Sequence, residues 1–184
     1  MADLNFFDAG VMDFVQRHLH NAVTDALFPM VTYLGELGAV WVLVAVVLLF
    51  FPKTKRCGGL MLLSMLAAFL VGEVFLKNVV DRPRPFQTYP GAVQLLIREP
   101  ASWSFPSGHS AASFAAATVV FAYFRRWGAA ALVLAALIAF SRVFLFVHYP
   151  TDVLAGAALG ALCALGVLAV FHKLALPHLS RWKK

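Results

Sequence analysis

The pattern of apolar and polar positions divides the chain into a mixed N-terminal part, five long apolar segments and one long polar loop. Positions 4–33 alternate apolar and polar residues with a roughly helical rhythm, and charged or imidazole side chains recur throughout. This part is too polar to cross a membrane. The pattern therefore predicts one or two amphipathic helices, lying at a membrane interface or against the rest of the protein.

The five apolar segments cover residues 37–51, 58–80, 108–124, 128–147 and 152–171. Each is close to the roughly 20 residues that a helix needs to cross a bilayer, and the first, short alone, can extend backward past Gly35. The polar loop 81–107 contains five prolines, which exclude a continuous helix there. We therefore expect an all-α, polytopic transmembrane helical bundle. It would have about five spans plus amphipathic N-terminal helices, and residues 1–184 would form a single integral membrane domain.

Composition supports a membrane protein and argues against nucleic acid as a partner. Hydrophobic residues make up 61% of the chain and charged residues 13%, against roughly 45–50% and 25% in soluble domains. The net charge is +6, but the basic residues stand at the ends of apolar segments and do not line an aromatic-interleaved face. Cys57 and Cys163 lack metal-ligand spacing and are interpreted as core residues. The spacing of Gly156 and Gly160 favours close helix packing inside the bundle over dimerisation. The oligomeric state is left undefined.

The distribution of Lys and Arg predicts the orientation in the membrane. Fifteen such residues are present, and nine fall on one side of the predicted bundle: Lys53, Lys55, Arg56, Arg125, Arg126, Lys173, Arg181, Lys183 and Lys184. Six fall on the other: Arg17, Lys77, Arg82, Arg84, Arg98 and Arg142. The positive-inside rule places the first set in the cytoplasm. The loop 81–107 and the functional candidates near it are then expected on the extracytoplasmic side of the cell membrane.

Three short blocks hold the candidate chemistry, and the first lies where the second apolar segment ends. Lys77 and Arg84 are seven residues apart, and two prolines end the helix between and after them. Lys77 would project from the helix end and Arg84 from the loop beyond it, so both could reach one anion at the membrane edge. Lys77 could instead extend to the interface and pair with Glu73 one turn earlier. Arg82 shares the setting of Arg84 and is a weaker candidate.

The second block is Pro106-Ser107-Gly108-His109, where the polar loop enters the third apolar segment. Serine is a favoured N-cap, and the first N–H groups of a helix form an anion site aligned with its dipole. Gly108 would let a ligand approach the backbone closely, and His109 could donate a proton to a leaving oxygen. The alternative is a capped helix start that happens to contain a histidine.

The third block begins with Ser141 and Arg142 and continues with His148 and Asp152. Asp152 is four residues after His148, close enough for its carboxylate to accept a hydrogen bond from one imidazole nitrogen and leave the other free to attack. A structural His–Asp bridge at a helix start is the alternative. Charged groups beside lipid are costly, so three blocks meeting on one face indicate function. Cations and backbone N–H groups would bind a phosphate, one histidine would attack it, and the other would protonate the leaving group.

These blocks resemble the three motifs of the type-2 phosphatidic acid phosphatase superfamily. The stretches 77–85, 106–109 and 141–152 match in residue type and internal spacing, and three matched blocks in order are highly specific although they cover a small part of the chain. Many relatives have six spans, whereas the pattern here gives five. The resemblance implies a helical bundle and a phosphatase that needs no metal and no cofactor.

The same resemblance implies a role for each matching residue. His148 would be the nucleophile that forms a phosphohistidine, Asp152 would orient it, and His109 would be the general acid. The phosphoryl oxygens would be held by Lys77, Arg84, Ser107, Gly108 and Arg142. Vanadium haloperoxidases share this constellation but are soluble proteins.

The expected substrate is a membrane lipid phosphate. The chain resembles the bacterial undecaprenyl pyrophosphate phosphatases, and undecaprenyl diphosphate, the spent carrier of cell-wall synthesis, is favoured because a compact protein with a small outer loop suits a simple diphosphate headgroup. Phosphatidylglycerol phosphate, phosphatidate and a lipid A phosphate are alternatives. A non-catalytic lipid- or anion-binding membrane protein, such as a transporter subunit, is the alternative of another class. Two imidazoles placed beside one anion argue against it, because binding alone would not need them.

Overall fold

The computed structural model describes residues 6–180, with side chains described as far as Leu174, and this part of the chain is helical without strands. The predicted all-α fold is confirmed. In chain order the elements are α1 (Phe6–His18), α2 (Ala22–Leu34), η1 (Glu36–Gly38), α3 (Ala39–Leu49), α4 (Lys55–Phe69), η2 (Leu70–Leu76), α5 (Lys77–Val80), α6 (Pro85–Thr88), α7 (Gly108–Tyr123), α8 (Arg125–Phe144) and α9 (Pro150–Ser180).

Helix α7 is the centre of the bundle, and its small residues allow this position. It packs against α4, α8 and α9, and Ala115, Ala116 and Ala117 are fully buried. The neighbouring α9 contributes Gly156 and Gly160, where an added Cβ would collide with the backbone carbonyls of residues 107 and 111 in α7. The small residues of α9 therefore serve close packing inside the bundle, as the sequence predicted.

Within the described residues, three helical segments are long and apolar enough to cross a membrane: Lys55–Thr88, Arg125–Phe144 and Pro150–Leu174. A fourth results if α2 and the η1–α3 segment, which meet at an angle of 46°, are taken together as one bent span. Helix α7, expected to be a span over 108–124, has 16 residues and is enclosed by its neighbours. The apolar segments thus form helices as expected, while the count of five spans stays a prediction.

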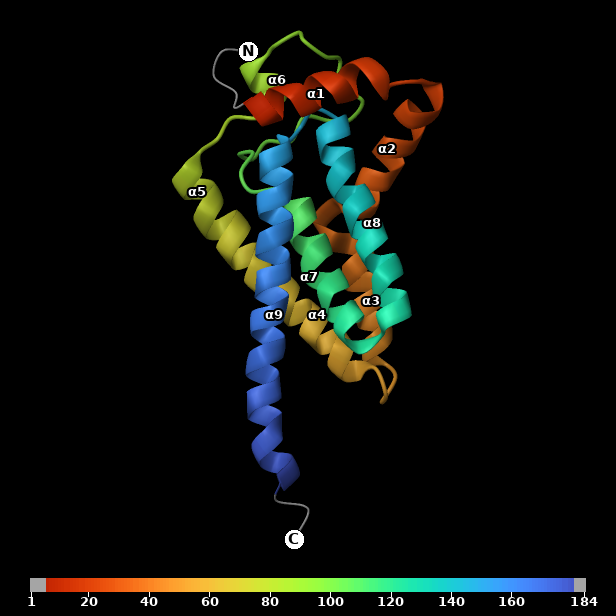
Figure 1. Ribbon diagram of the computed structural model, residues 1–184, viewed down its shortest axis with the longest axis vertical. Helices are drawn as coiled ribbons and strands as arrows, with labels where there is room; N and C mark the ends of the chain where they lie inside the picture. Colours follow the sequence, from red (N-terminus) through yellow and green to blue (C-terminus); the bar gives the residue numbers. More distant parts are fainter. Residues whose placement is uncertain (1–5, 181–184) are drawn as a thin grey trace.

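The N-terminal region forms two helices, as the pattern predicts, and they lie in different places. Helix α1 lies across one end of the bundle (Figure 1), but α2 runs into the bent pair with α3. The reason is that the polar residues of α2 are concentrated at its start, where the Asn21 side chain accepts from the backbone N–H groups of Val23 and Thr24. The rest of α2 is largely apolar. The bend itself contains Leu37 and Gly38, both with positive φ, at 50° and 69°.

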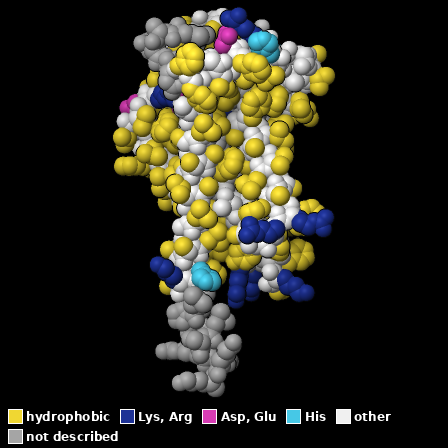
Figure 2. All heavy atoms as spheres, viewed as in Figure 1, with side chains coloured by type: hydrophobic (Ala, Val, Ile, Leu, Met, Phe, Trp, Pro, Cys, Tyr) yellow, Lys and Arg dark blue, Asp and Glu magenta, His cyan; other side chains and the backbone are white. Residues whose placement is uncertain are grey.

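The two ends of the molecule differ in chemical character. The loop 81–107, α1 and the start of α9 lie at one end, and the α3–α4 and α7–α8 turns lie at the other (Figure 1). Exposed cations, including Lys53, Lys55, Arg125 and Arg126, flank those two turns. Hydrophobic side chains cover the surface between the ends (Figure 2), as expected for a surface in contact with lipid.

Candidate active site

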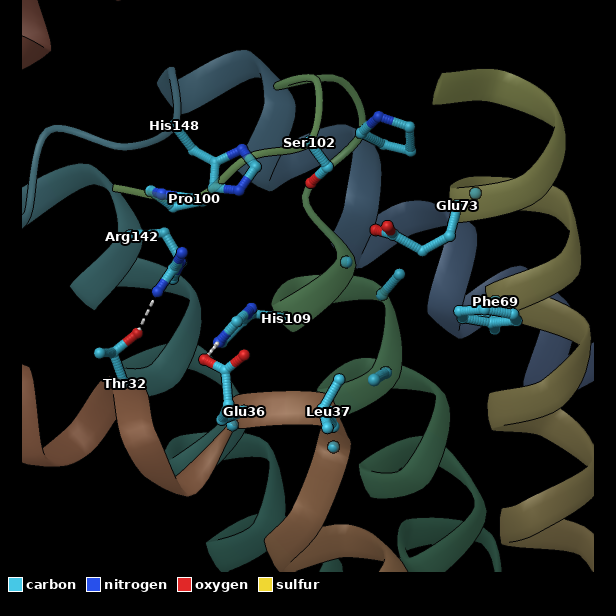
Figure 3. Close-up of a pocket in the computed structure, with 18 of the residues that line it drawn as sticks. Thr32, Glu36, Leu37, Phe69, Glu73, Pro100, Ser102, His109, Arg142 and His148 are labelled. Carbon is cyan, nitrogen blue, oxygen red and sulfur yellow. Dashed lines mark hydrogen bonds and ion pairs between the residues drawn. The ribbon is translucent and has the colours of Figure 1, made fainter. Parts of the chain in front are cut away.

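The three sequence blocks meet around one cavity at the end of the bundle that contains the 81–107 loop. The cavity has a volume of about 730 Å³. Of the eight predicted site residues, six line it: Lys77, Arg84, Gly108, His109, Arg142 and His148. The other two, Ser107 and Asp152, lie directly behind, at the first turns of α7 and α9. Side chains from α8, α7 and the loop before α9 point into the same space (Figure 3).

His148 is buried, and its contacts define which ring nitrogen carries the lone pair. Its Nε2 atom lies 3.0 Å from Nη1 of Arg84, and a guanidinium can only donate. Nε2 is therefore the acceptor, and the ring proton of the neutral imidazole belongs on Nδ1. The pKa of His148 lies well below the usual range because of burial and then the charges of Arg84, Arg142 and Lys77. The ring is neutral at physiological pH, with the Nε2 lone pair on the cation side.

Asp152 stands behind His148, but the predicted direct hydrogen bond is replaced by a longer contact. Its Oδ2 lies 3.6 Å from Nδ1 of His148. The hydroxyl of Ser104 lies between them, 2.5 Å from Oδ2 and 3.5 Å from Nδ1. Oδ2 also accepts from the backbone N–H of Tyr149 at 3.0 Å. The carboxylate is thus already engaged, and Ser104 connects it to the imidazole.

The three predicted cations are all buried. Lys77 donates to both carboxylate oxygens of Glu73 at 2.7 Å, so it lines the cavity and forms the pair with Glu73 at the same time. Arg84 donates to the backbone carbonyls of Ser102 and Val147 at 2.6 and 2.8 Å. These bonds hold both side chains in place without neutralising Arg84.

Arg142 is oriented by a single partner. Its Nη1 donates to the Thr32 hydroxyl on α2 at 2.5 Å. Its Nε makes no hydrogen bond within the described residues. The guanidinium therefore presents an unused donor beside the cavity, where a phosphoryl oxygen would satisfy it.

The N-terminus of α7 faces a carboxylate in the empty site. Ser107 caps the helix, as predicted, by accepting from the N–H of Ser110 at 3.4 Å. An added Cβ at Gly108 would collide with Oε1 of Glu73, so glycine lets an anionic oxygen lie against the helix start. The carboxylate of Glu73 therefore occupies a position suited to a phosphate.

His109 lies one residue further on, beside the bend between α2 and α3. Its Nε2 is 3.6 Å from Oε2 of Glu36, a distance suited to charge attraction and too long for a hydrogen bond. Gly35 gives the ring its space, because an added Cβ there would lie 2.9 Å from the Cδ2 atom of His109. The bend thus brings a carboxylate to the predicted general acid.

Sequence reasoning missed Ser104 and Asp8 and misjudged the place of Arg82. Arg82, the weaker phosphate candidate, donates instead to Asp152 Oδ1 at 2.6 Å and to Asp8 Oδ2 at 2.8 Å. Asp8 is fully buried although it belongs to the amphipathic N-terminal region. No local pattern marks these contacts, because they join residues between 44 and 74 positions apart.

The described residues contain no group of three or more His, Cys, Asp or Glu side chains that could hold a metal ion. The site offers cations, N–H groups and two imidazoles to an anion. Fold and site together define a class, namely helical membrane proteins with a cavity at one end of the bundle that is lined by cations and imidazoles.

Comparison with known proteins gives the family. The model of the PAP2 superfamily matches residues 58–175, well over half of the chain, and the chain belongs to this superfamily. It is 34% identical over 155 residues to the bacitracin transport permease protein BcrC of Bacillus licheniformis, covering 83% of this chain and 75% of that protein. It is 33% identical over 135 residues to an undecaprenyl-diphosphatase of Sulfolobus acidocaldarius, covering 72% of this chain and 65% of that protein.

A solved structure agrees with the fold. The crystal structure of Aquifex aeolicus LpxE is similar with a TM-score of 0.78 and 28% identity, covering 91% of this chain and 97% of that chain. These similarities confirm the predicted family, the helical membrane fold and the enzyme class, a phosphatase of membrane lipids. Helix α1 lies outside the segment that matches the family model.

Proposed function

We propose that this chain is a polyprenyl diphosphate phosphatase that works through a phosphohistidine on His148, with undecaprenyl diphosphate as its substrate. The observation that carries the proposal is the placement of the His148 Nε2 lone pair beside Arg84 at the wall of a cavity lined by further cations. A neutral imidazole held among positive charges is suited to attack a phosphorus atom whose oxygens those charges bind.

Binding places the terminal phosphate among Lys77, Arg84, Arg142 and the start of α7. Glu73 leaves the helix start as the phosphate arrives, and the ammonium of Lys77 exchanges a carboxylate for phosphoryl oxygens. The unused Nε donor of Arg142 gains an acceptor. The N–H groups of the first turn of α7, beyond the Ser107 cap, face the same anion.

In the first step, Nε2 of His148 attacks phosphorus, and the bond from phosphorus to the bridging oxygen breaks. His109 gives its proton to that oxygen, so the lipid monophosphate leaves without an additional negative charge on the former bridging oxygen. The imidazole of His148 becomes cationic, and Asp152 stabilises the positive charge through Nδ1 and Ser104. In the second step, His109 accepts a proton from water, the hydroxide oxygen bonds to phosphorus, and the nitrogen–phosphorus bond breaks. Inorganic phosphate is released and His148 returns to its neutral form.

The rest of the cavity supports a lipid as the substrate. Beyond the polar end it is lined by apolar residues of α3 and of α4, among them Val42, Leu66 and Phe69. Leu37 and Phe69 also line the cavity (Figure 3), and their side chains are exposed to the surroundings of the bundle. A cavity that is polar at one end and apolar toward the lipid-facing side suits a headgroup with an attached hydrocarbon chain. The relative named undecaprenyl-diphosphatase favours an isoprenoid diphosphate among such lipids.

Side-by-side turnover of undecaprenyl diphosphate and phosphatidylglycerol phosphate by the purified protein in one detergent tests the substrate. We expect phosphate release from both with a higher kcat/KM for the diphosphate, and His148→Ala should abolish it. His172→Ala, an exposed histidine in the far part of α9, is the matched control and should leave turnover unchanged. Faster turnover of phosphatidylglycerol phosphate would contradict the assignment of undecaprenyl diphosphate as the substrate. Activity of His148→Ala within tenfold of the parent would contradict the nucleophile, and no turnover of either lipid would favour a binding protein.

Metal independence is part of the proposal. Phosphate charge is met by guanidinium, ammonium and N–H groups, and the described part of the chain lacks a carboxylate cluster suited to Mg²⁺. Activity is therefore expected to survive a strong chelator. Complete loss with EDTA that is restored by added metal would overturn the mechanism.

We further propose that the active site faces the extracytoplasmic side. The exposed cations of the α3–α4 and α7–α8 turns stand at the opposite end of the bundle, and the positive-inside rule puts that end in the cytoplasm. In a background without the native cysteines, a cysteine at the exposed Gln94 of the 81–107 loop should react with an impermeant thiol reagent in intact cells. A cysteine at Lys55 should react only after the membrane is opened. The reverse pattern would exclude a function at the outer leaflet.

A further inference from the structure

Asp8 is a buried carboxylate that the proposed mechanism leaves unexplained. It belongs to the first turns of α1, the helix that lies across the site end of the bundle (Figure 1), and its side chain is fully buried. The exposed side of the same helix contains Asp13, which pairs with Arg17 at 2.7 Å. An aspartate buried under an amphipathic helix loses its hydration and needs hydrogen-bonding or charged partners that compensate for that loss.

Those partners connect α1 to the first turn of α9. Oδ1 of Asp8 accepts from the backbone N–H of Thr151 at 2.9 Å. Oδ2 accepts from the Thr151 hydroxyl at 2.7 Å and from Nη2 of Arg82 at 2.8 Å. Thr151 immediately precedes Asp152, the residue that faces the nucleophile. Asp8 thus holds the backbone in place at Thr151, immediately before Asp152.

Arg82 connects the two carboxylates directly. Its Nη1 donates to Asp152 Oδ1 at 2.6 Å and to the Thr151 hydroxyl at 2.8 Å, while Nη2 donates to Asp8. The guanidinium also lies 3.8 Å from the centre of the Tyr149 ring. One fork-shaped cation therefore bridges two fully buried anions, a geometry that an ammonium group could not reproduce.

The shared charge has a consequence for the nucleophile. When His148 attacks phosphorus, its imidazole becomes positive and needs the negative charge of Asp152. If Asp8 were absent, the positive charge of Arg82 would be neutralised by Asp152 alone and would compete with the imidazolium for that carboxylate. Because Asp8 neutralises part of the charge of Arg82, more of the negative charge of Asp152 remains available to His148.

We propose that Asp8 is a positioning residue for the reaction: through Arg82 and Thr151, α1 holds Asp152 in place and leaves its charge available to the nucleophile. This inference rests on the proposed role of His148. It makes α1, which lies outside the family match, part of the catalytic arrangement rather than a membrane anchor alone.

The test is the kinetic effect of Asp8→Asn, which keeps the size of the side chain and removes its charge. We expect kcat to fall by about 10–100-fold, the range seen when partners that orient metal ligands are removed. KM and inhibition by inorganic phosphate should be unchanged, because the phosphate-binding cations lie elsewhere. The control is Asp13→Asn, on the exposed side of the same helix, which should match the parent.

A double-mutant comparison separates positioning from simple attachment of α1. If Asp8 acts through Asp152, then Asp8→Asn should cause no further loss of kcat in an Asp152→Asn background. A purely structural role would lower the yield or thermal stability of folded protein while kcat per folded molecule stayed at the parent value, and that result would overturn the inference. If Asp8→Asn fails to fold, Arg82→Lys replaces it in the same kinetic comparison. Lysine keeps the positive charge but cannot reach both carboxylates, so we again expect a lower kcat that is not lowered further in the Asp152→Asn background.

The same experiment distinguishes failure of this inference from failure of the proposed function. The parent protein and His148→Ala are measured in parallel. An inactive parent, or an active His148→Ala, would refute the phosphohistidine mechanism itself. An active parent and an inactive His148→Ala, together with Asp8→Asn within twofold of the parent, would refute only the role of Asp8.

Discussion

Ser104→Ala is a sharp test of how Asp152 acts on His148. The Ser104 side chain is fully buried, and its hydroxyl lies 2.5 Å from Asp152 Oδ2 and 3.5 Å from His148 Nδ1. The substitution removes this oxygen and leaves the 3.6 Å gap between Nδ1 and Oδ2 unfilled. The phosphate-binding cations keep their own partners.

The size of the effect follows from the kind of hydrogen bond that is lost. Hydrogen bonds to a charged group contribute about 1.5–3 kcal/mol. If this full energy stabilises the transition state, in which the imidazole becomes positive, its loss lowers kcat by roughly 10- to 160-fold, at 1.36 kcal/mol per tenfold change in rate. Closure of the gap by a small movement of the His148 ring would place the loss near the lower end of this range. KM should stay close to the parent value because ground-state binding of the phosphate is not altered.

The assay is steady-state phosphate release, supported by a single-turnover measurement of phosphoenzyme formation. The matched control is Ser64→Ala in α4, which also removes a fully buried hydroxyl, one that makes no hydrogen bond within the described residues. It should leave kcat unchanged. A Ser104→Ala kcat within twofold of the parent would refute the reasoning, and a raised KM with unchanged kcat would show that Ser104 acts on substrate binding instead.

Four further predictions concern the other polar groups of the cavity. Glu73→Gln should tighten inhibition by inorganic phosphate roughly tenfold, because the anion no longer competes with a carboxylate for Lys77; an unchanged or weaker inhibition constant would show that Glu73 only holds Lys77 in place. Because the pKa of His148 is lowered well below 6.5 by burial and neighbouring cations, the nucleophile stays unprotonated as pH falls, and kcat/KM should show no acidic limb centred at 6.5 or above. The same shift means that protons bind the unfolded chain more readily, so stability should fall as pH drops below about 6.5, which thermal unfolding across pH would measure. His109→Ala should be rescued in part on a substrate whose leaving group needs no protonation, and equal damage on both substrates would count against the role of general acid.

Much of the site could be predicted from the sequence because its chemistry is concentrated in short blocks. Lys77 lies in the last turn of a helix that ends at Val80, and Arg84 follows that end. Ser107 and His109 stand at a helix start, so local rules place all four residues near a terminus where an anion can reach them. What joins the blocks is the order of apolar segments, which brings alternate helix ends to one side of the bundle.

The remaining parts depend on contacts that no local pattern specifies. Ser104 stands in an irregular loop, and its importance follows only from its distance to Asp152, 48 positions away. Arg82 and Arg84 each precede a proline and are two residues apart, yet the two side chains contact different partners. Glu36 reaches His109 because α2 and α3 meet at a bend whose positive φ values lie at Leu37 and Gly38, and Leu37 gives no sequence signal for that conformation.

The π-helical turn η2 between α4 and α5 has a consequence for how related sequences are compared. In residues 70–76 the backbone hydrogen bonds span five residues instead of four, and Glu73 and Lys77 lie within and just after this turn. One residue corresponds to about 100° of rotation around a regular helix. The loss of a single residue between 70 and 76 would therefore leave hydropathy nearly unchanged and still turn Lys77 away from the cavity. Insertions and deletions here should be selected against as strongly as changes of the lysine itself, although the hydropathy of the segment is that of an ordinary membrane helix.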